Sequence, residues 1–330
     1  EDPTGLWLGT AGGGLTRLVA GQPAVRYTRA DGLGSDQVMC AARDPAGELW
    51  FGTWAGGVTR VKARQFGNRA VFSLVTARDG LGNDNIRAIS FDTEGRAWVG
   101  TGGAGAACVE TALKRRYFTS FKQVDGLAHD MVASIAQDDR DRLWFGTFGG
   151  GVSCYDAKNL ARPWTNYGTK EGLGHVTVRC ALQDADGRLW FGTAGGGLTR
   201  HHPRTLEWKS FTTAEGLPGN TVRAARRIGD QLWFGTDRGV ATIDAKAGVG
   251  FAALGPEVGL PATTVVALAE WNSAIYVATL GDGLYRRGPG DEQFSKVEGL
   301  GVSSLLCLAS TDNALFIGTH GDGLFALSKD

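Results

Sequence analysis

One five-residue phrase recurs eight times along the chain, and this repetition limits the possible folds more than any other feature. Its commonest form is Leu-Trp-Phe-Gly-Thr, and weaker variants stand in the last two copies. Successive copies begin 40 to 48 residues apart, with the aromatic residue at Trp7, Trp50, Trp98, Trp144, Trp190, Trp233, Tyr276 and Phe316. This period is typical of the four-stranded blade of a β-propeller.

Each repeat contains four segments that we expect to be strands, named A to D from the propeller axis outward. The repeated phrase is strand B, and a glycine cluster with a short apolar run, as at residues 11–18, indicates a tight turn and strand C. Strand D follows, as at residues 71–76, and ends in an acidic residue, Gly and Leu. Strand A, as in residues 177–183, leads through an Asp-x-x-Gly hairpin turn into the next strand B.

Counting these segments predicts an all-β propeller of eight blades, with seven blades as the alternative. Eight B and eight C strands are present, but only seven A and seven D, so the first and last blades should be incomplete. A single propeller domain is expected over residues 1–330, because each repeat buries its faces against its neighbours and so allows a domain of this size. The incomplete end blades indicate that the chain is cut from a longer polypeptide.

Composition and charge argue against several classes of partner. The formal net charge is zero and the 34 basic residues are scattered, which predicts no binding of nucleic acid and no contact with an anionic membrane. No apolar run approaches the roughly 18 residues that span a bilayer.

Small residues recur at fixed places in the repeat. Trp50 and Gly52 should share one face of strand B, so that the glycine makes room for the indole. The third residue of each expected strand A is small, and cysteine occupies it three times. Two further cysteines, Cys108 and Cys154, lie on strands C. None of the five cysteines has metal-ligand spacing, which favours a packing role for them. The three strand A cysteines are Cys40, Cys180 and Cys307.

Three sets of polar residues allow more than one interpretation. The acidic residues before Gly-Leu are predicted to cap turns rather than to bind a metal; they are Asp31, Asp79, Asp125, Glu171, Glu215 and Glu298. The strand A arginines Arg87, Arg179 and Arg223 are expected either to meet an anionic ligand or to pair with acidic neighbours. Adjacent His201 and His202 are interpreted as surface residues. No metal and no cofactor is predicted.

The B–C turns and the D–A connections should emerge together around the mouth of the central channel, and they differ between blades where the strands do not. Loops on a rigid scaffold are where function concentrates, so we expect a ligand there. The turns contribute Trp54, Phe148, Asp237, Arg238, Asp282, His320 and Asp322, and the connections contribute His129, Asp130 and His175. Aromatic stacking and hydrogen bonds, without catalysis, are the expected mode of binding.

The combination of Asp-Gly-Leu, Val-Arg-Ala and Asp-x-x-Gly-x-Leu-Trp-Phe-Gly-Thr resembles the two-component regulator propeller repeat of bacterial hybrid histidine kinases. It is most specific at residues 32–50, 172–190 and 216–233. The resemblance implies a periplasmic or extracellular sensor module that binds a small molecule or carbohydrate and acts on an output signalling domain.

Two other functions remain open in the sequence. A scaffold could dock a protein partner on the same face, and a lyase or hydrolase is the third possibility. The sequence contains no G-x-S-x-G or H-E-x-x-H motif, and its Asp-x-x-Gly spacing differs from that of a sialidase Asp box. A binding module is therefore preferred to an enzyme.

Overall fold

The computed structural model describes residues 6–19, 22–66, 69–110, 118–246, 250–311, 313–320 and 322–328. Its regular elements are β-strands and six short 3-10 helices in this part of the chain, without any α-helix. The strands form eight antiparallel sheets, which confirms the predicted eight blades. They fall into two compact units, Glu1–Asn166 and Tyr167–Asp330. The prediction of one domain over the whole chain stays a prediction.

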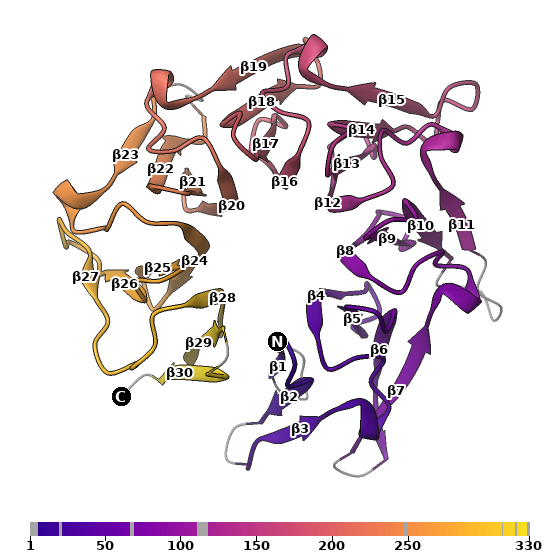
Figure 1. Ribbon diagram of the computed structural model, residues 1–330, viewed down its shortest axis with the longest axis horizontal. Helices are drawn as coiled ribbons and strands as arrows, with labels where there is room; N and C mark the ends of the chain where they lie inside the picture. The colour runs from indigo at the N-terminus through magenta and orange to yellow at the C-terminus, as the bar shows by residue number, and fades with distance from the viewer. Residues whose placement is uncertain are drawn as a thin grey trace. The chain divides into compact units, whose positions relative to one another are not determined.

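Figure 1 shows the strands of each blade following one another from an inner to an outer strand. The first blade has three strands and the next three blades have four. Their bounds are β1 (Leu6–Gly9), β2 (Leu15–Leu18) and β3 (Val25–Tyr27); β4 (Val38–Arg43), β5 (Leu49–Thr53), β6 (Val58–Phe66) and β7 (Arg69–Val75); β8 (Ile86–Phe91), β9 (Ala97–Thr101), β10 (Ala106–Val109) and β11 (Phe118–Phe121); and β12 (Val132–Gln137), β13 (Leu143–Thr147), β14 (Val152–Tyr155) and β15 (Trp164–Tyr167).

The remaining blades follow the same plan, and the last again has three strands. Their bounds are β16 (Val178–Gln183), β17 (Leu189–Thr193), β18 (Leu198–His202) and β19 (Glu207–Phe211); β20 (Val222–Ile228), β21 (Gln231–Thr236), β22 (Gly239–Asp244) and β23 (Ala252–Leu254); β24 (Val265–Trp271), β25 (Ala274–Thr279), β26 (Leu284–Arg287) and β27 (Ser295–Lys296); and β28 (Leu305–Ser310), β29 (Ala314–Thr319) and β30 (Leu324–Ser328). The predicted lack of strand A in the first blade and of strand D in the last is confirmed for the described residues.

The repeated tryptophan lies in the contact between one blade and the next. Trp50 is fully buried in a cluster with Ile86 and Val99 of the following blade, and its ring meets Phe91 edge-on at 5.3 Å between centroids. A β-carbon added to Gly52 would lie 2.6 Å from the Ile86 side chain. The glycine shares the tryptophan's face as predicted, but the side chains that need the space are Ile86 of the next blade and Cys40 rather than the indole.

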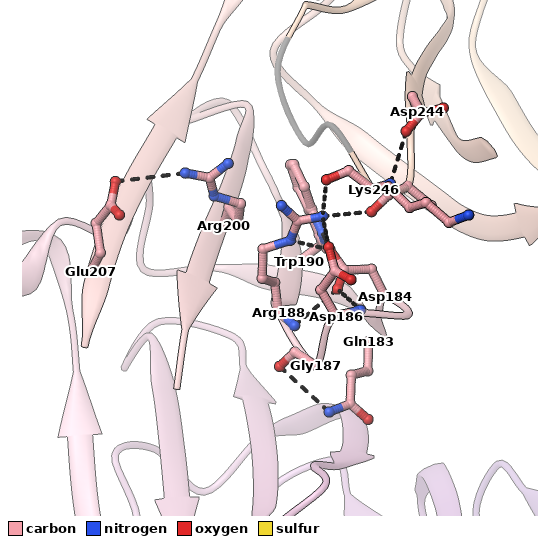
Figure 2. Close-up of polar contacts among 11 residues, drawn as sticks. Gln183, Asp184, Asp186, Gly187, Arg188, Trp190, Arg200, Glu207, Asp244 and Lys246 are labelled. Atoms are coloured by element: carbon pink, nitrogen blue, oxygen red, sulfur yellow. Dashed lines mark hydrogen bonds and ion pairs between the residues drawn. The ribbon is translucent and has the colours of Figure 1, made fainter. Parts of the chain in front are cut away.

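A buried carboxylate holds the indole nitrogen, and Figure 2 shows this arrangement in the fifth blade. Asp184 Oδ2 accepts hydrogen bonds from Trp190 Nε1 at 2.8 Å and from Arg188 Nε at 2.7 Å, while Oδ1 accepts the backbone N–H of Arg188. Arg188 also donates to the carbonyl oxygens of Ala245 and Lys246, so the same group ties two blades together. The equivalent pairs are Trp50 with Asp44, Trp98 with Asp92 and Trp144 with Asp138.

The sixth blade lacks this carboxylate, because its A–B turn contains Ile228, Gly229 and Asp230 instead of Asp-x-x-Gly. Trp233 is 1% exposed, and its Nε1 has no hydrogen-bond partner. We therefore expect Trp144→Phe to cost about 1–2 kcal/mol more unfolding free energy than Trp233→Phe, since only the first change breaks a buried hydrogen bond. Urea denaturation of both variants checks this, and equal losses would show that the indole–carboxylate bond contributes nothing.

The strand A cysteines fill the space beside the strand B glycine. The Sγ atoms of Cys40 and Cys180 lie 2.5 Å from where a β-carbon on Gly52 or Gly192 would stand. Burial raises the pKa of both thiols to about 12. This geometry confirms packing as their structural role.

Because deprotonation of these buried thiols requires high pH, we expect native Cys40 and Cys180 to resist alkylation. At pH 8 their thiolate fraction should be about a thousandfold below that of a thiol with the ordinary pKa of 9.0. Peptide mapping after iodoacetamide treatment, before and after unfolding in urea, measures the difference. Rapid native labelling of both residues would contradict the predicted burial.

Six D–A connections begin with a one-turn 3-10 helix where the sequence indicated only a turn, and the described connection from β27 to β28 has none. In the first of them, η1 (Arg29–Asp31), Asp31 Oδ2 accepts the N–H of Thr28 at 2.9 Å, and Gly32 ends the turn at a φ of 105° that side chains disfavour. The same capping confirms the predicted role of Asp79, Asp125, Glu171 and Glu215. Glu298 lies in the described connection without a 3-10 helix, and its predicted capping role stays a prediction. The other helices are η2 (Ala77–Asp79), η3 (Gln123–Asp125), η4 (Thr169–Glu171), η5 (Thr213–Glu215) and η6 (Pro256–Val258).

The interpretation of His201 as a surface residue is wrong. Its ring is fully buried and stacks on Trp208, with 4.1 Å between centroids. Strand β18 continues through His202, so His201 lies within the strand rather than in a turn. It pairs with Trp208 of the neighbouring strand β19, and the two side chains therefore share one face of the sheet. His202 is half-buried, and its Nδ1 accepts the backbone N–H of Arg204.

Candidate functional site

In the first unit, the B–C turns and the D–A connections lie at the same end of the blades, as predicted. The N–H of Trp54 donates to the carbonyl oxygen of Gln37 at the start of strand A in its own blade. The N–H groups of Gly57 and Gly105 donate to the carbonyl oxygens of Asp84 and Asp130, respectively. Each of these aspartates lies in the connection that enters the following blade. Two further bonds, from Gly102 N–H to the Asn85 carbonyl oxygen and from Phe148 N–H to the Met131 carbonyl oxygen, complete the series. The segments joined in this way form what we call the rim: residues 54–57, 83–85, 102–105, 128–131 and 148–151.

Trp54 is the most exposed large aromatic residue of the rim, with 41% of its surface accessible. It stands between β5 and β6 in a tight turn whose geometry is fixed by the bond from Thr53 Oγ1 to the Gly57 carbonyl oxygen at 2.8 Å. The Arg87 guanidinium carbon lies 5.0 Å from the centroid of the indole. Arg87 belongs to β8 of the next blade, so the contact crosses from one blade to another.

A bulge at the start of β8 aims Arg87 at the turn. Ile86 pairs with Thr101 and Ala88 with Gly100, which leaves Arg87 as the extra residue. Bulges redirect side chains in this way and are common near functional sites. The sequence interpretation that Arg87 pairs with an acidic neighbour is not realised among the described residues, since its partner is Trp54.

The turn of the third blade carries only the buried methyl group of Ala104, whereas the turns of the second and fourth blades carry aromatic side chains. Gly102 and Gly103 occupy it, next to the amides of Asn85 and Asn83. Asn85 Oδ1 is buried without a hydrogen-bond partner. The rim of this unit therefore has a glycine-rich turn beside polar amides. The blades before and after it in the chain carry Trp54 and Phe148 in the equivalent turns.

His129 lies beside the turn that carries Phe148, at the rim of the fourth blade. The N–H of Phe148 donates to the Met131 carbonyl oxygen, and the His129 ring lies 3.5 Å from the position of a β-carbon on Gly149. His129 Nδ1 accepts the N–H of Met131 at 3.0 Å, so the neutral ring carries its proton on Nε2. This tautomer makes Nε2 a hydrogen-bond donor.

Asp130 has a structural task that the sequence analysis did not recognise. Its Oδ1 accepts the N–H of Gln123 at 2.8 Å and so fixes the start of η3. Asp36, Asp84 and Asn220 make the same bond in their own connections. The recurrence of Asp or Asn at this place in the repeat was the available signal for a structural function.

In the second unit, the predicted residues occupy equivalent turns and connections. His175 Nδ1 accepts the N–H of Thr177 at 3.0 Å, as His129 does for Met131. Asp237 Oδ1 accepts the N–H of Thr221 at 3.0 Å, which gives this carboxylate a structural role. Arg238, His320 and Asp322 are exposed, and Asp282 is half-buried.

The inner strands of the second unit concentrate positive charge. Arg179 on β16 and Arg223 on β20 occupy the same place in their strands as Arg87 does in β8. Burial, and secondarily the charge of Arg223, lower the pKa of Arg179 below its usual range. Arg223 is exposed.

No described helix is long and apolar enough to cross a membrane. Within the described residues, no group of three or more histidine, cysteine, aspartate or glutamate side chains is arranged to hold a metal ion.

Solved structures with the same fold include several bacterial surface proteins. The extracellular domain of the putative hybrid two-component system BT4673 from B. thetaiotaomicron is 20% identical, with a TM-score of 0.68; the alignment covers 88% of this chain and 40% of that domain. PorZ of Porphyromonas gingivalis is 21% identical, with a TM-score of 0.63 and coverage of 96% and 50%. The computationally designed protein Ika8 is 14% identical, with a TM-score of 0.69 and coverage of 100% and 94%. The chain thus spans half or less of the two natural proteins.

No curated protein matches the sequence. Four segments match the model of the two-component regulator propeller, at residues 32–55, 80–103, 126–149 and 172–195. Each runs from the glycine that ends a 3-10 helix, through strands A and B, into a B–C turn. The chain is thus a β-propeller, and four of its repeats match the two-component regulator propeller.

Proposed function

We propose that the chain is the ligand-sensing module of a bacterial signalling protein and binds a carbohydrate on the rim of its first unit. The observation that carries this proposal is the pair of aromatic side chains, Trp54 and Phe148, on two blades that flank the glycine turn at Gly102. Aromatic faces bind the C–H surfaces of sugar rings, and nearby amides and imidazoles hydrogen-bond sugar hydroxyls. Asn83, Asn85 and His129 supply such groups.

The chemistry of the rim supports binding rather than catalysis. Asp130 and Asp237 each accept a backbone N–H through one carboxylate oxygen and help to hold a loop in place. A glycosidase needs a pair of carboxyl groups on either side of the scissile bond, whereas the carboxylates of the first unit's rim, Asp84 and Asp130, each accept a backbone N–H at the start of a 3-10 helix.

The setting in a signalling protein rests on the relatives. BT4673 is described as a putative hybrid two-component system, and its similar region is an extracellular domain. We infer that this chain likewise functions in the periplasm or outside the cell, with an output domain elsewhere in its polypeptide.

A binding panel tests the proposal. The purified 330-residue chain is titrated calorimetrically with neutral and acidic oligosaccharides, among them cello-, xylo- and manno-oligosaccharides and oligogalacturonides. Saturable binding of at least one oligosaccharide is expected, with competition between ligands that share a ring type. Failure of the folded chain to bind any of them, together with retention of a protein partner on the same rim, would replace the sensor by a scaffold.

A further inference from the structure

Arg87 differs from most arginines that lie over tryptophan rings in this protein. Arg60 over Trp50 pairs with Glu48, and Arg142 over Trp144 pairs with Asp138. Within the part of the chain that the structure describes, no carboxylate lies within ion-pair distance of Arg87. Its positive charge is therefore not neutralised by the fold.

Arg87 also has unused hydrogen-bonding capacity. Its Nε is buried and has no hydrogen-bond partner, and the residue as a whole is only half-buried. Two residues earlier, Asn85 Oδ1 is a buried acceptor without a donor. A buried polar atom without a partner costs stability, so a ligand that supplies an acceptor to Arg87 and a hydroxyl to Asn85 would gain that energy on binding.

Arg287 is the instructive contrast. It lies over Trp233 and Phe294 and also lacks an acidic partner among the described residues, but both rings are buried and offer no open face to a ligand. Trp54, by contrast, is 41% exposed on the rim. An unneutralised guanidinium next to an open aromatic face occurs here at Trp54 and Arg87.

From this combination we propose that Trp54 and Arg87 bind an anionic sugar, with the sugar ring against the indole and its carboxylate or sulfate on the guanidinium. A guanidinium binds such oxyanions through two parallel, charge-assisted N–H donors, whereas the hydroxyl groups of a neutral sugar accept hydrogen bonds without an opposite charge. The bulge at Ile86 and Ala88 is what brings the guanidinium to this place. This inference rests on the proposed function and specifies the ligand's chemical class.

The test compares one ligand with and without its charge. Trigalacturonate, its fully methyl-esterified form and a sulfated galactan oligosaccharide are titrated into the full chain by calorimetry. The acidic ligands should bind about 10- to 100-fold more tightly than the ester, as expected for a hydrogen-bonded ion pair. The sulfated ligand carries a sulfate ester in place of the carboxylate and has a different backbone, so its binding shows whether the site also accepts sulfate.

Variants separate charge recognition from stacking. Arg87→Gln should reduce the affinity for the acidic ligand to that for the ester and leave the ester unchanged, whereas Trp54→Ala should weaken both. Arg223→Gln is the matched control, because Arg223 holds the same strand position in β20 and is exposed. It should leave both affinities unchanged, and circular dichroism melts should confirm that all three variants fold.

Two outcomes would overturn the inference. Equal affinity for acid and ester, or an Arg87→Gln variant that binds the acid normally, would show that Arg87 does not recognise the anion. If a neutral oligosaccharide then binds and is lost in Trp54→Ala, the proposed function stands and only the ligand class is wrong. Absence of binding by every oligosaccharide to the folded chain would overturn both.

Discussion

Replacing Trp144 by alanine should cost about 3–5 kcal/mol of unfolding free energy, the usual range for removing a buried aromatic residue. The indole is fully buried between blades, and its Nε1 donates to Asp138 at 2.8 Å. The substitution leaves a cavity and also takes one donor from a buried carboxylate. Guanidinium denaturation, followed by circular dichroism, measures the loss.

Trp54→Ala is the matched control, because Trp54 lies in a turn and is 41% exposed. It should cost less than about 1 kcal/mol, since little apolar surface is returned to water. Equal and small losses in the two variants would mean that the repeated tryptophan does not hold neighbouring blades together.

Replacing Trp54 and Phe148 together by alanine should abolish carbohydrate binding and leave the melting temperature nearly unchanged. Both side chains stand in B–C turns whose backbone is held by hydrogen bonds that do not involve the rings, such as those from Thr53 and Thr147 Oγ1 to glycine carbonyls. Stacking rings therefore contribute to binding far more than to folding. Calorimetric titration with the best ligand of the panel gives the affinity, and thermal melting gives the stability.

A second double variant isolates the rim of the first unit. Arg238 and His320 lie in B–C turns of the other unit and are exposed, so Arg238→Ala combined with His320→Ala should leave binding intact. Normal binding by the Trp54 and Phe148 double variant would place the ligand elsewhere. Loss of binding in the control pair would do the same.

The blade plan could be predicted from the sequence because one strand period and one turn chemistry recur in every repeat. Trp50 and Gly52 were placed on one face by the alternation of side chains along a strand. The reason for the glycine could not be predicted, because it depends in part on Ile86, which belongs to the next blade. The bond from Trp50 to Asp44 was likewise missed, although a fixed spacing of six residues was its signal.

The candidate site was predicted in part. Variation of the turn residues pointed to Trp54 and Phe148, and the structure places both turns on the rim. The contact of Arg87 with Trp54 was not foreseen, because it joins residues of two blades through a bulge that the sequence does not reveal. His201 was misassigned because β18 extends further than the repeat indicated, and Trp208 of the outer strand covers its ring.

Fluorine NMR of the chain labelled with 5-fluorotryptophan tests the central claim most directly, since the claim is that a carbohydrate binds on the rim at Trp54. The Trp54 resonance is identified by its loss in Trp54→Phe, and the oligosaccharide with the highest affinity is then titrated into the labelled protein. We predict that the Trp54 resonance shifts in proportion to the bound fraction, while those of the buried Trp98, Trp144 and Trp190 stay in place. A Trp54 resonance that does not move at saturating ligand would contradict the account.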